Sequence, residues 1–551
     1  PVATLNVALT LSPVLSALAM YVLLRRWVSW APAAFVGGLL YGFSPFILLF
    51  LTDAHLMLTM VPFPPLVVAC LDELFVRQRR SPVVTGVLLA LLVWVQFFIG
   101  TEMLVLIAMA AAIGVVVTVV LNVRHIRVIG RKARYALTAM MAAAVTGGVL
   151  LAYPTWFALA GPAHLSGPIW GTNSIVSLGG TNLRDYLFPA PTSARSTTFA
   201  HRFGGYQGPA LSEQYLGIGL LVVLVVGLVI WRRDLRLWLF TAVGATSVLL
   251  SFGLQNYWTL WSVVLKLPLM QNVVPSRFLI VTYLCAAVML GLIVDHVHRS
   301  VDHRWPVTQA REAGSADAAW ERPRGRPTAG AVAGVVVSLI ALVPIAWYYV
   351  GSLPLTTQEV VLPRWYRTVA PHLTGRQVIL AFPVPFAFLE SSMTWQAVDS
   401  MSFDQIGGGG PNSIPERAGK EGPAQSVLGS LSIASTVKVT SEQVTSTRQA
   451  LDGWGVTMVV VPDSASLPLY EKVYTVRSIV VLITAATGQK PIRQAGAWVW
   501  THVDRAPSLI PVSSARLSVC SAGPQTDSVA SLAASADCVL ASPGARSGPA
   551  Q

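Results

Sequence analysis

An aspartate and a histidine stand two residues apart between apolar runs in the segment FLTDAHLML, residues 50–58. A carboxylate such as Asp53 can act as a general base on a hydroxyl group, or it can hold a divalent metal together with His55. The same aspartate can instead cap the following helix, because Asp is a favoured N-cap residue. Both interpretations place the pair at a turn between two helices.

A second acidic residue, Glu102, follows an apolar run in the segment FFIGTEMLVL, with Gln96 about two turns earlier. The dipole of a helix favours an acid in its first turn, which is a structural alternative for Glu102. Ionisable groups beside long apolar runs are costly at membrane depth and are therefore candidates for function. We take Asp53, His55 and Glu102 as the candidate catalytic set.

Arginines that can hold a phosphate lie in two further segments. Guanidinium groups bind phosphate through paired hydrogen bonds and stabilise the negative charge of a leaving phosphate. Arg277, at the end of the second segment, can instead anchor a helix at the membrane interface. From residues 161–214 and 255–277, the candidate substrate-binding residues are Arg184, Arg202, Glu213 and Arg277.

The composition places these residues in a membrane protein. Of 551 residues, 54% are hydrophobic and 11% are charged, and the mean hydropathy is +0.61. Soluble domains carry about 25% charged residues. The formal charge of +13 is explained by basic cytoplasmic loops rather than by nucleic-acid binding, because no basic stretch is interleaved with aromatic residues.

Long apolar runs predict ten membrane-spanning helices, each of about 20 residues. The predicted spans are 3–24, 31–51, 56–75, 82–100, 102–123, 135–160, 215–231, 237–254, 277–296 and 329–351. Span 56–75 is interrupted by VPFPP.

Basic residues alternate between the loops that connect these spans. Nineteen Lys and Arg residues fall in one set of loops and five in the other. The basic set is 25–27, 77–80, 124–134, 232–236 and 298–327. The positive-inside rule places this set in the cytoplasm, so both chain ends and all the candidate site residues are expected on the outer face of the cell membrane.

Residues 352–551 contain no further spanning run and predict a small extracytoplasmic α/β domain. Buried strands are expected in RQVILAFPV (376–384), VTMVVVP (456–462) and AWVWTHV (497–503), a helix at 440–455, and a flexible glycine-rich loop at 407–410. The expected fold is therefore an all-α polytopic bundle followed by an α/β domain. Its parts are a bundle at 1–351 with an outer loop 161–214 and a cytoplasmic loop 298–328, a domain at 352–540 and a disordered tail at 541–551.

Four cysteines occur in the chain. Cys520 and Cys538 lie in the external region, where disulfides persist, and we expect them to be joined. Cys70 and Cys285 lie within spans and are interpreted as small apolar residues.

Carboxylates and arginines on the outer face suit the transfer of a sugar from a lipid-linked donor. A carboxylate can activate a sugar hydroxyl, and arginines can receive the phosphate of a lipid-linked donor that arrives laterally through the bilayer. The sequence has no phosphate-binding loop or dinucleotide fingerprint. A nucleotide-sugar donor is therefore not expected.

The chain resembles the GT-C-type polytopic glycosyltransferases of bacteria, particularly those of actinobacteria. The resemblance rests on residues 41–74 (YGFSPFILLFLTDAHLMLTMVPFPPLVVACLDEL), QFFIGTEML (96–104), SEQYLGIGLL (212–221) and LPLMQNVVPSRFL (267–279). It implies a polyprenyl-phosphate sugar as donor and an extracytoplasmic glycan or lipid as acceptor. No cofactor is implied with certainty, although a divalent metal is compatible.

Members of that family usually begin with one more helix and an outer loop that bears the catalytic Asp or Glu. This chain begins at what resembles the second family helix. We therefore expect an upstream sequence that encodes the further helix and the acidic loop, or else loss or replacement of the catalytic base.

Two other functions remain open. A transporter or flippase for a lipid-linked glycan needs polar residues along a path through the bundle, whereas here they cluster on one face. A non-catalytic membrane protein of cell-envelope assembly, whose external domain binds a partner or polysaccharide, is favoured by the missing acidic loop. All three functions involve membrane lipids and glycans.

Overall fold

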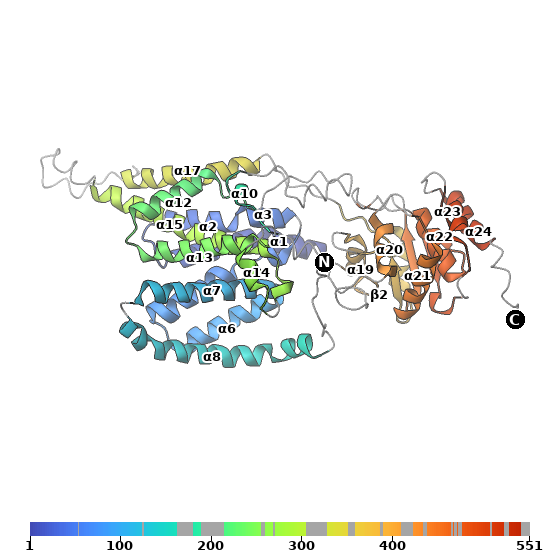
Figure 1. Ribbon diagram of the computed structural model, residues 1–551, viewed down its shortest axis with the longest axis horizontal. Helices are drawn as coiled ribbons and strands as arrows, with labels where there is room; N and C mark the ends of the chain where they lie inside the picture. Colours follow the sequence, from blue (N-terminus) through green and yellow to red (C-terminus); the bar gives the residue numbers. More distant parts are fainter. Residues whose placement is uncertain are drawn as a thin grey trace.

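The computed structural model describes residues 1–52, 54–123, 126–161, 180–188, 214–254, 259–267, 270–304, 328–350, 359–385, 389–408, 423–433, 438–463, 467, 471, 476–506, 510–522 and 528–541. Helices make up the first part of the chain, through Val350, and helices with a sheet make up the part after residue 359 (Figure 1). Each part has a hydrophobic core of its own.

The helical bundle contains these elements in order: α1 (Val2–Leu24), α2 (Ala31–Gly42), α3 (Pro45–Thr52), α4 (Leu56–Thr59), α5 (Phe63–Asp72), η1 (Glu73–Arg77), α6 (Pro82–Ile99), α7 (Thr101–Leu121), α8 (Ile126–Leu159), α10 (Leu183–Leu187), α12 (Ile218–Ile230), α13 (Leu235–Ser251), α14 (Leu260–Val264), η3 (Met270–Asn272), η4 (Pro275–Phe278), α15 (Leu279–Arg304) and α17 (Ala329–Val350).

Seven segments of the described chain are long and apolar enough to cross a membrane. They are Val2–Leu24, Leu56–Arg77, Pro82–Ile99, Thr101–Leu121, Ala133–Leu159, Pro275–Asp302 and Ala329–Val350. The predicted span 31–51 is two helices, α2 and α3, bent by 41°, and Pro45 begins the second because it has no N–H to continue the hydrogen bonds of the first. The predicted spans 215–231 and 237–254 correspond to α12 and α13, of 13 and 17 residues. The count of ten crossings stays a prediction.

Helix α15 lies at the centre of the bundle, and the most apolar part of its membrane-length segment is completely buried. It packs against α13, α17 and α2. Small residues allow this close approach: a Cβ at Gly37 of α2 would lie 2.7 Å from the carbonyl oxygen of Ala287 in α15. Such residues let membrane helices pack closely.

Salt bridges and hydrogen bonds gather the basic loops at one end of the bundle, the basic end. Arg26, after α1, pairs with Asp72 and Glu73 where α5 meets η1. Asp295 of α15 accepts a hydrogen bond from the N–H of Ser29, just before α2. Three separate loops or helix ends are therefore fixed to one another.

The remaining basic loops reach the same end. Arg236, at the start of α13, donates to the carbonyl oxygen of Trp27, and Tyr135 of α8 donates to that of Arg80. Asp302 of α15 accepts from the N–H group of Gly330 in α17, so the termini of both helices lie here too. The basic loops that alternate along the sequence thus lie together at one end of the bundle. We predict from the positive-inside rule that this end faces the cytoplasm.

A five-stranded sheet in the order β2–β1–β3–β5–β4 forms the centre of the C-terminal part. The strands are β1 (Val378–Ala381), β2 (Asp404–Gln405), β3 (Met458–Pro462), β4 (Ile492–Gln494) and β5 (Ala497–Thr501). β1 is parallel to β2 and β3, whereas β5 is antiparallel to β3 and β4. The three predicted strands are confirmed as β1, β3 and β5, and the other two are too short for a periodic pattern to reveal.

Seven described α-helices accompany the sheet: α18 (Arg364–Thr368), α19 (Ser391–Val398), α20 (Pro423–Ile433), α21 (Ser441–Gly453), α22 (Val476–Thr487), α23 (Ser514–Ser521) and α24 (Val529–Leu540). α21 is the predicted helix 440–455, and Thr440 and Gln443 form a capping box at its start. The predicted glycine-rich loop is described only to Gly408, and residues 542–551 of the predicted tail lie outside the described residues.

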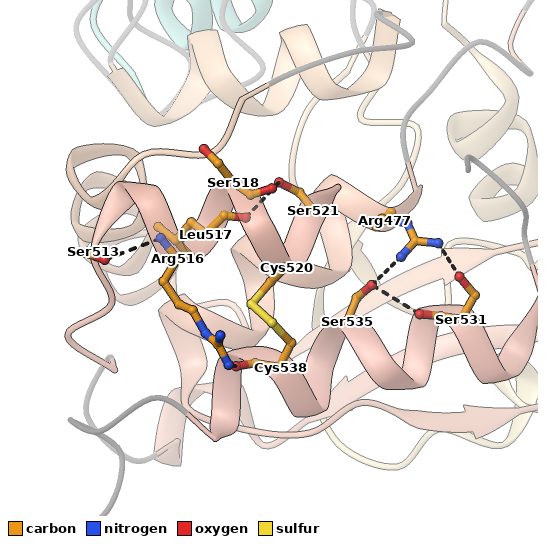
Figure 2. Close-up of a disulfide and its surroundings, with 10 residues drawn as sticks. All are labelled: Arg477, Ser513, Arg516, Leu517, Ser518, Cys520, Ser521, Ser531, Ser535 and Cys538. Carbon is orange, nitrogen blue, oxygen red and sulfur yellow. Dashed lines mark hydrogen bonds between the residues drawn. A yellow bond between two sulfur atoms is a disulfide. The ribbon is translucent and has the colours of Figure 1, made fainter. Parts of the chain in front are cut away.

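Cys520 of α23 and Cys538 of α24 are joined as a disulfide, with their Cα atoms 5.6 Å apart (Figure 2). Beside it, Arg477 of the buried helix α22 donates hydrogen bonds to Ser531 and Ser535 of α24. The disulfide and the arginine therefore hold the last helix of the described chain against α23 and α22.

Replacing Cys520 and Cys538 with serine is expected to lower the free energy of unfolding of this part by about 3 kcal/mol, because the crosslink closes a short loop in the unfolded chain. Chemical unfolding of the full chain, monitored by tryptophan fluorescence, measures the change. Wild-type protein treated with a reductant is the control and should match the double variant. Mass spectrometry that finds both thiols free in protein from an oxidising compartment would contradict the expectation.

Candidate functional site

Glu102 and Arg277, which lie far apart in the sequence, form an ion pair in the structure. Glu102 is in the first turn of α7 and Arg277 is in η4. The Oε2 atom of Glu102 contacts Nη1 of Arg277, and its Oε1 atom accepts a hydrogen bond of 2.8 Å from the N–H of Val274. The side chains are 17% and 16% exposed. Both carboxylate oxygens are thus engaged, and the acid fixes the segment that leads into α15.

The pair lies at the end of the bundle opposite the basic end. α6 begins next to the basic loop 77–80 and ends at Ile99, and α7 runs back from Thr101 toward the basic loop 124–134. The α6–α7 turn also approaches the segment after His55: a Cβ at Gly100 would lie 3.3 Å from the Cβ of Met57. The turns that carry His55 and Glu102 are therefore neighbours.

His55 itself directly precedes the short helix α4, and its ring meets that of Phe50 edge-on at 5.8 Å. Asp53, its partner in the predicted catalytic set, lies outside the described residues, as do Arg202 and Glu213. The structure therefore brings together the predicted catalytic residue Glu102 and the predicted substrate-binding residue Arg277 as an ion pair, and leaves Asp53 as a candidate from the sequence.

A buried cluster of hydroxyl groups supports the same end of the bundle. Thr181, Tyr186 and Ser251 share hydrogen bonds of 2.7 to 3.3 Å among their side-chain oxygens. The carbonyl oxygen of Tyr186 also accepts the N–H of Leu216. The short helix α10 is thereby fixed to the end of α13 and to the start of the segment before α12.

Helix α10 carries Arg184, whose side chain is exposed. The sequence predicted this arginine as a phosphate ligand, and the structure places it at the end of the bundle that holds Glu102. The hydroxyl cluster that positions it has no sequence signal, because isolated Ser, Thr and Tyr residues are common in any loop.

Two buried glutamines at this end have carboxamide oxygens without a hydrogen-bond partner among the described residues, Gln96 and Gln214. Gln96 is 1% exposed, and its amide nitrogen donates to the carbonyl oxygen of Gly100. Gln214 is 6% exposed and directly precedes Tyr215. Buried polar atoms are usually satisfied, so unsatisfied acceptors suit the hydroxyl groups of a ligand.

An apolar groove opens at the α6–α7 turn that precedes Glu102. It has a volume of about 550 Å³ and lies between the α6–α7 turn and the end of α8. Its walls include Phe97, Phe98 and Thr101 on one side and Tyr153, Pro154 and Phe157 on the other. Thr101 directly precedes Glu102, so the groove reaches the residue next to the acid. A long hydrocarbon chain is the kind of ligand that such a surface can accept.

A metal site is not evident in the described part of the chain, where no three His, Cys, Asp or Glu residues group together. Asp53 lies outside the described residues, so its suggested metal role stays a hypothesis.

Comparison with known proteins found no matching protein-family model and no matching curated protein. Among solved structures, the chain is similar to that described as "Single-Particle Cryo-EM Structure of Arabinofuranosyltransferase AftD from Mycobacteria", with 14% sequence identity and a TM-score of 0.42. The match covers 90% of this chain and 33% of that one. The chain thus spans about a third of the length of the protein it matches, and at this level of similarity the match assigns no role to any residue.

Proposed function

We propose that this chain is an integral-membrane glycosyltransferase that moves a sugar from a polyprenyl-phosphate donor to an extracytoplasmic glycan or lipid acceptor. The observation that supports this most is the Glu102–Arg277 pair, which lies at the end of the bundle away from the basic loops. The α6–α7 turn that precedes Glu102 also lines an apolar groove. A phosphate with a long prenyl chain needs both a cation and an apolar surface.

In this proposal, the oxygen of an acceptor hydroxyl attacks the anomeric carbon of the donor sugar. The bond between that carbon and the phosphate oxygen breaks, and polyprenyl phosphate leaves with the bonding electrons. Arg277 stabilises the charge that develops on the phosphate. The hydroxyl proton passes to a carboxylate, for which Asp53 is the candidate.

Glu102 takes a positioning role in this scheme. Since one of its oxygens contacts Arg277 and the other accepts the N–H of Val274, it holds the guanidinium rather than acting as the base. Gln96 and Gln214 supply acceptors for sugar hydroxyl groups. This assignment changes the sequence-based hypothesis that Glu102 is catalytic.

The same engagement of Glu102 favours a second candidate, a non-catalytic protein of cell-envelope assembly. If no free carboxylate exists at this end of the bundle, the site can bind a lipid-linked glycan without transferring its sugar. The two candidates share the lipid ligand and differ in turnover.

The decisive experiment separates binding from transfer. Full-length protein in nanodiscs is incubated with polyprenyl phosphate or with polyprenol, and bound lipid is measured by native mass spectrometry. We expect the wild type to retain the phosphate form at least tenfold better, since Arg277 pairs with the phosphate. Arg277→Gln should lose this preference, and Arg364→Gln, an exposed arginine of α18, is the matched control.

Transfer is then followed with a radiolabelled polyprenyl-phosphate sugar and glycan acceptors. Binding with turnover supports the transferase, and binding without turnover supports the assembly protein. Equal retention of polyprenol and polyprenyl phosphate by the wild type would overturn both.

A further inference from the structure

An open pocket of about 550 Å³ lies at the basic end, away from the site described above. It is lined by Ile230, Trp231, Arg232, Arg233, Asp234 and His296. Ile230 is the last residue of α12, the next four residues join α12 to α13, and His296 comes from the central helix α15. None of the candidate catalytic or substrate-binding residues that the structure describes lines this pocket.

Polar contacts fix the inner wall of the pocket. Asp234 caps α13 by accepting the N–H of Arg236, and it pairs with the guanidinium of Arg236 at 2.6 Å. It also lies 2.9 Å from Nε2 of His296. Arg299 lies 3.2 Å from Nδ1 of the same ring and pairs with Asp295. Since a guanidinium can only donate, Nδ1 accepts and Nε2 carries the proton toward Asp234.

The carboxylate and the imidazole are therefore occupied, and the ring of Trp231 stacks on that of His296 at 5.4 Å. Arg232 and Arg233 differ from these residues. Both side chains are exposed, and within the described ranges neither guanidinium has a hydrogen bond or ion pair. The guanidinium groups of Arg232 and Arg233 are therefore available to a ligand, next to the hydrogen-bonded side chains of Asp234 and His296.

Exposed apolar residues continue from the pocket along the sides of α12 and α13. Ile230 and Val229 of α12 are 60% and 66% exposed, and Trp238 of α13 is 42% exposed. The indole nitrogen of Trp238 donates to the carbonyl oxygen of Arg232. Tryptophan with an apolar body and a polar edge is typical of the level of lipid headgroups. The two arginines therefore stand where a helix leaves the hydrocarbon layer.

We propose that this pocket binds the phosphate of an anionic glycerophospholipid from the leaflet that faces the basic loops. An anionic lipid headgroup and a soluble phosphate ester both carry a phosphate anion. Two guanidinium groups can bind such an anion with paired hydrogen bonds. The lipid, rather than a soluble phosphate ester, is the proposed source because the acyl chains would lie along the exposed apolar residues of α12 and α13. Basic pockets at such helix ends are suited to anionic headgroups. The binding is independent of the glycosyltransferase proposal.

The test uses full-length protein in nanodiscs of phosphatidylcholine, with and without phosphatidylglycerol. Retained phosphatidylglycerol is measured by native mass spectrometry after release from the nanodisc. The double variant Arg232→Gln/Arg233→Gln is expected to retain it about tenfold less than the wild type. Arg79→Gln/Arg80→Gln removes two exposed arginines from another loop at the same end and should change retention less than twofold.

Thermal unfolding in pure phosphatidylcholine checks that both double variants remain folded. Equal loss of retention in the two variants would overturn the proposal, because it would reflect net charge rather than a site. In a second arm, inorganic phosphate and glycerophosphoglycerol are added to protein in phosphatidylcholine. Stabilisation by either of these as large as that by phosphatidylglycerol would assign the pocket to a soluble anion and overturn the lipid assignment.

Discussion

Arg277→Gln is expected to lower the rate of sugar transfer about a hundredfold or more while binding of the acceptor changes little. In the proposed reaction the guanidinium stabilises the charge on the leaving phosphate, and removing one group that stabilises developing charge typically costs this much. Transfer of labelled sugar in nanodiscs measures the effect, and thermal unfolding of the same samples measures stability. Full activity in Arg277→Gln would contradict the proposed site, as would a loss that follows unfolding.

The role of Glu102 is separated from that of Arg277 by a double-mutant cycle. If Glu102 acts only by holding Arg277, Glu102→Gln lowers transfer less than Arg277→Gln does, and the double variant is no worse than Arg277→Gln alone. If Glu102 is itself the base, the double variant transfers sugar more slowly than Arg277→Gln alone. Asp53→Asn tests the remaining candidate. If Asp53 is the general base, the variant lowers the rate of transfer about 10²- to 10⁴-fold. If Asp53 only caps a helix, the variant costs about 1 kcal/mol of stability.

The sequence identified Glu102 and Arg277 separately, because ionisable residues beside apolar runs are conspicuous. Their pairing was not predictable from the sequence, since it depends on how α7 and η4 both pack against α13. The hydroxyl cluster of Thr181, Tyr186 and Ser251 gave no pattern at all, because it forms only when two distant turns meet.

Some helices could be predicted from local sequence, whereas others could not. Apolar runs predicted α1, α6 and α7 because a single span of about 20 residues is a local property. The break between α2 and α3 lies at Pro45, an internal proline that the sequence already marks as a point where a span can kink. Helix α22 is buried along its whole length. Its apolar run at residues 479–483 is equally compatible with a buried strand, so the sequence does not distinguish the two.

A reporter enzyme that is active only outside the cytoplasm should be active when fused after Ser352 and silent when fused after Arg233. The reason is the distribution of basic residues, nineteen in one set of loops and five in the other, together with the rule that basic loops stay in the cytoplasm. The structure makes this test unusually sharp. Because contacts such as Arg26–Asp72 and Arg236–Trp27 tie the basic loops together at one end, one orientation decides the location of all of them.

The matched control is a reporter that fluoresces only in the cytoplasm, fused at the same two positions, which should give the opposite pattern. A fusion after Arg80 extends the test to a second basic loop and should behave like that after Arg233. If instead the outside-active reporter works after Arg233 and Arg80 but not after Ser352, the Glu102–Arg277 pair faces the cytoplasm. Nucleotide-linked donors are then available to it, a lipid-phosphate donor is no longer required, and the proposed transfer to an extracytoplasmic acceptor is wrong.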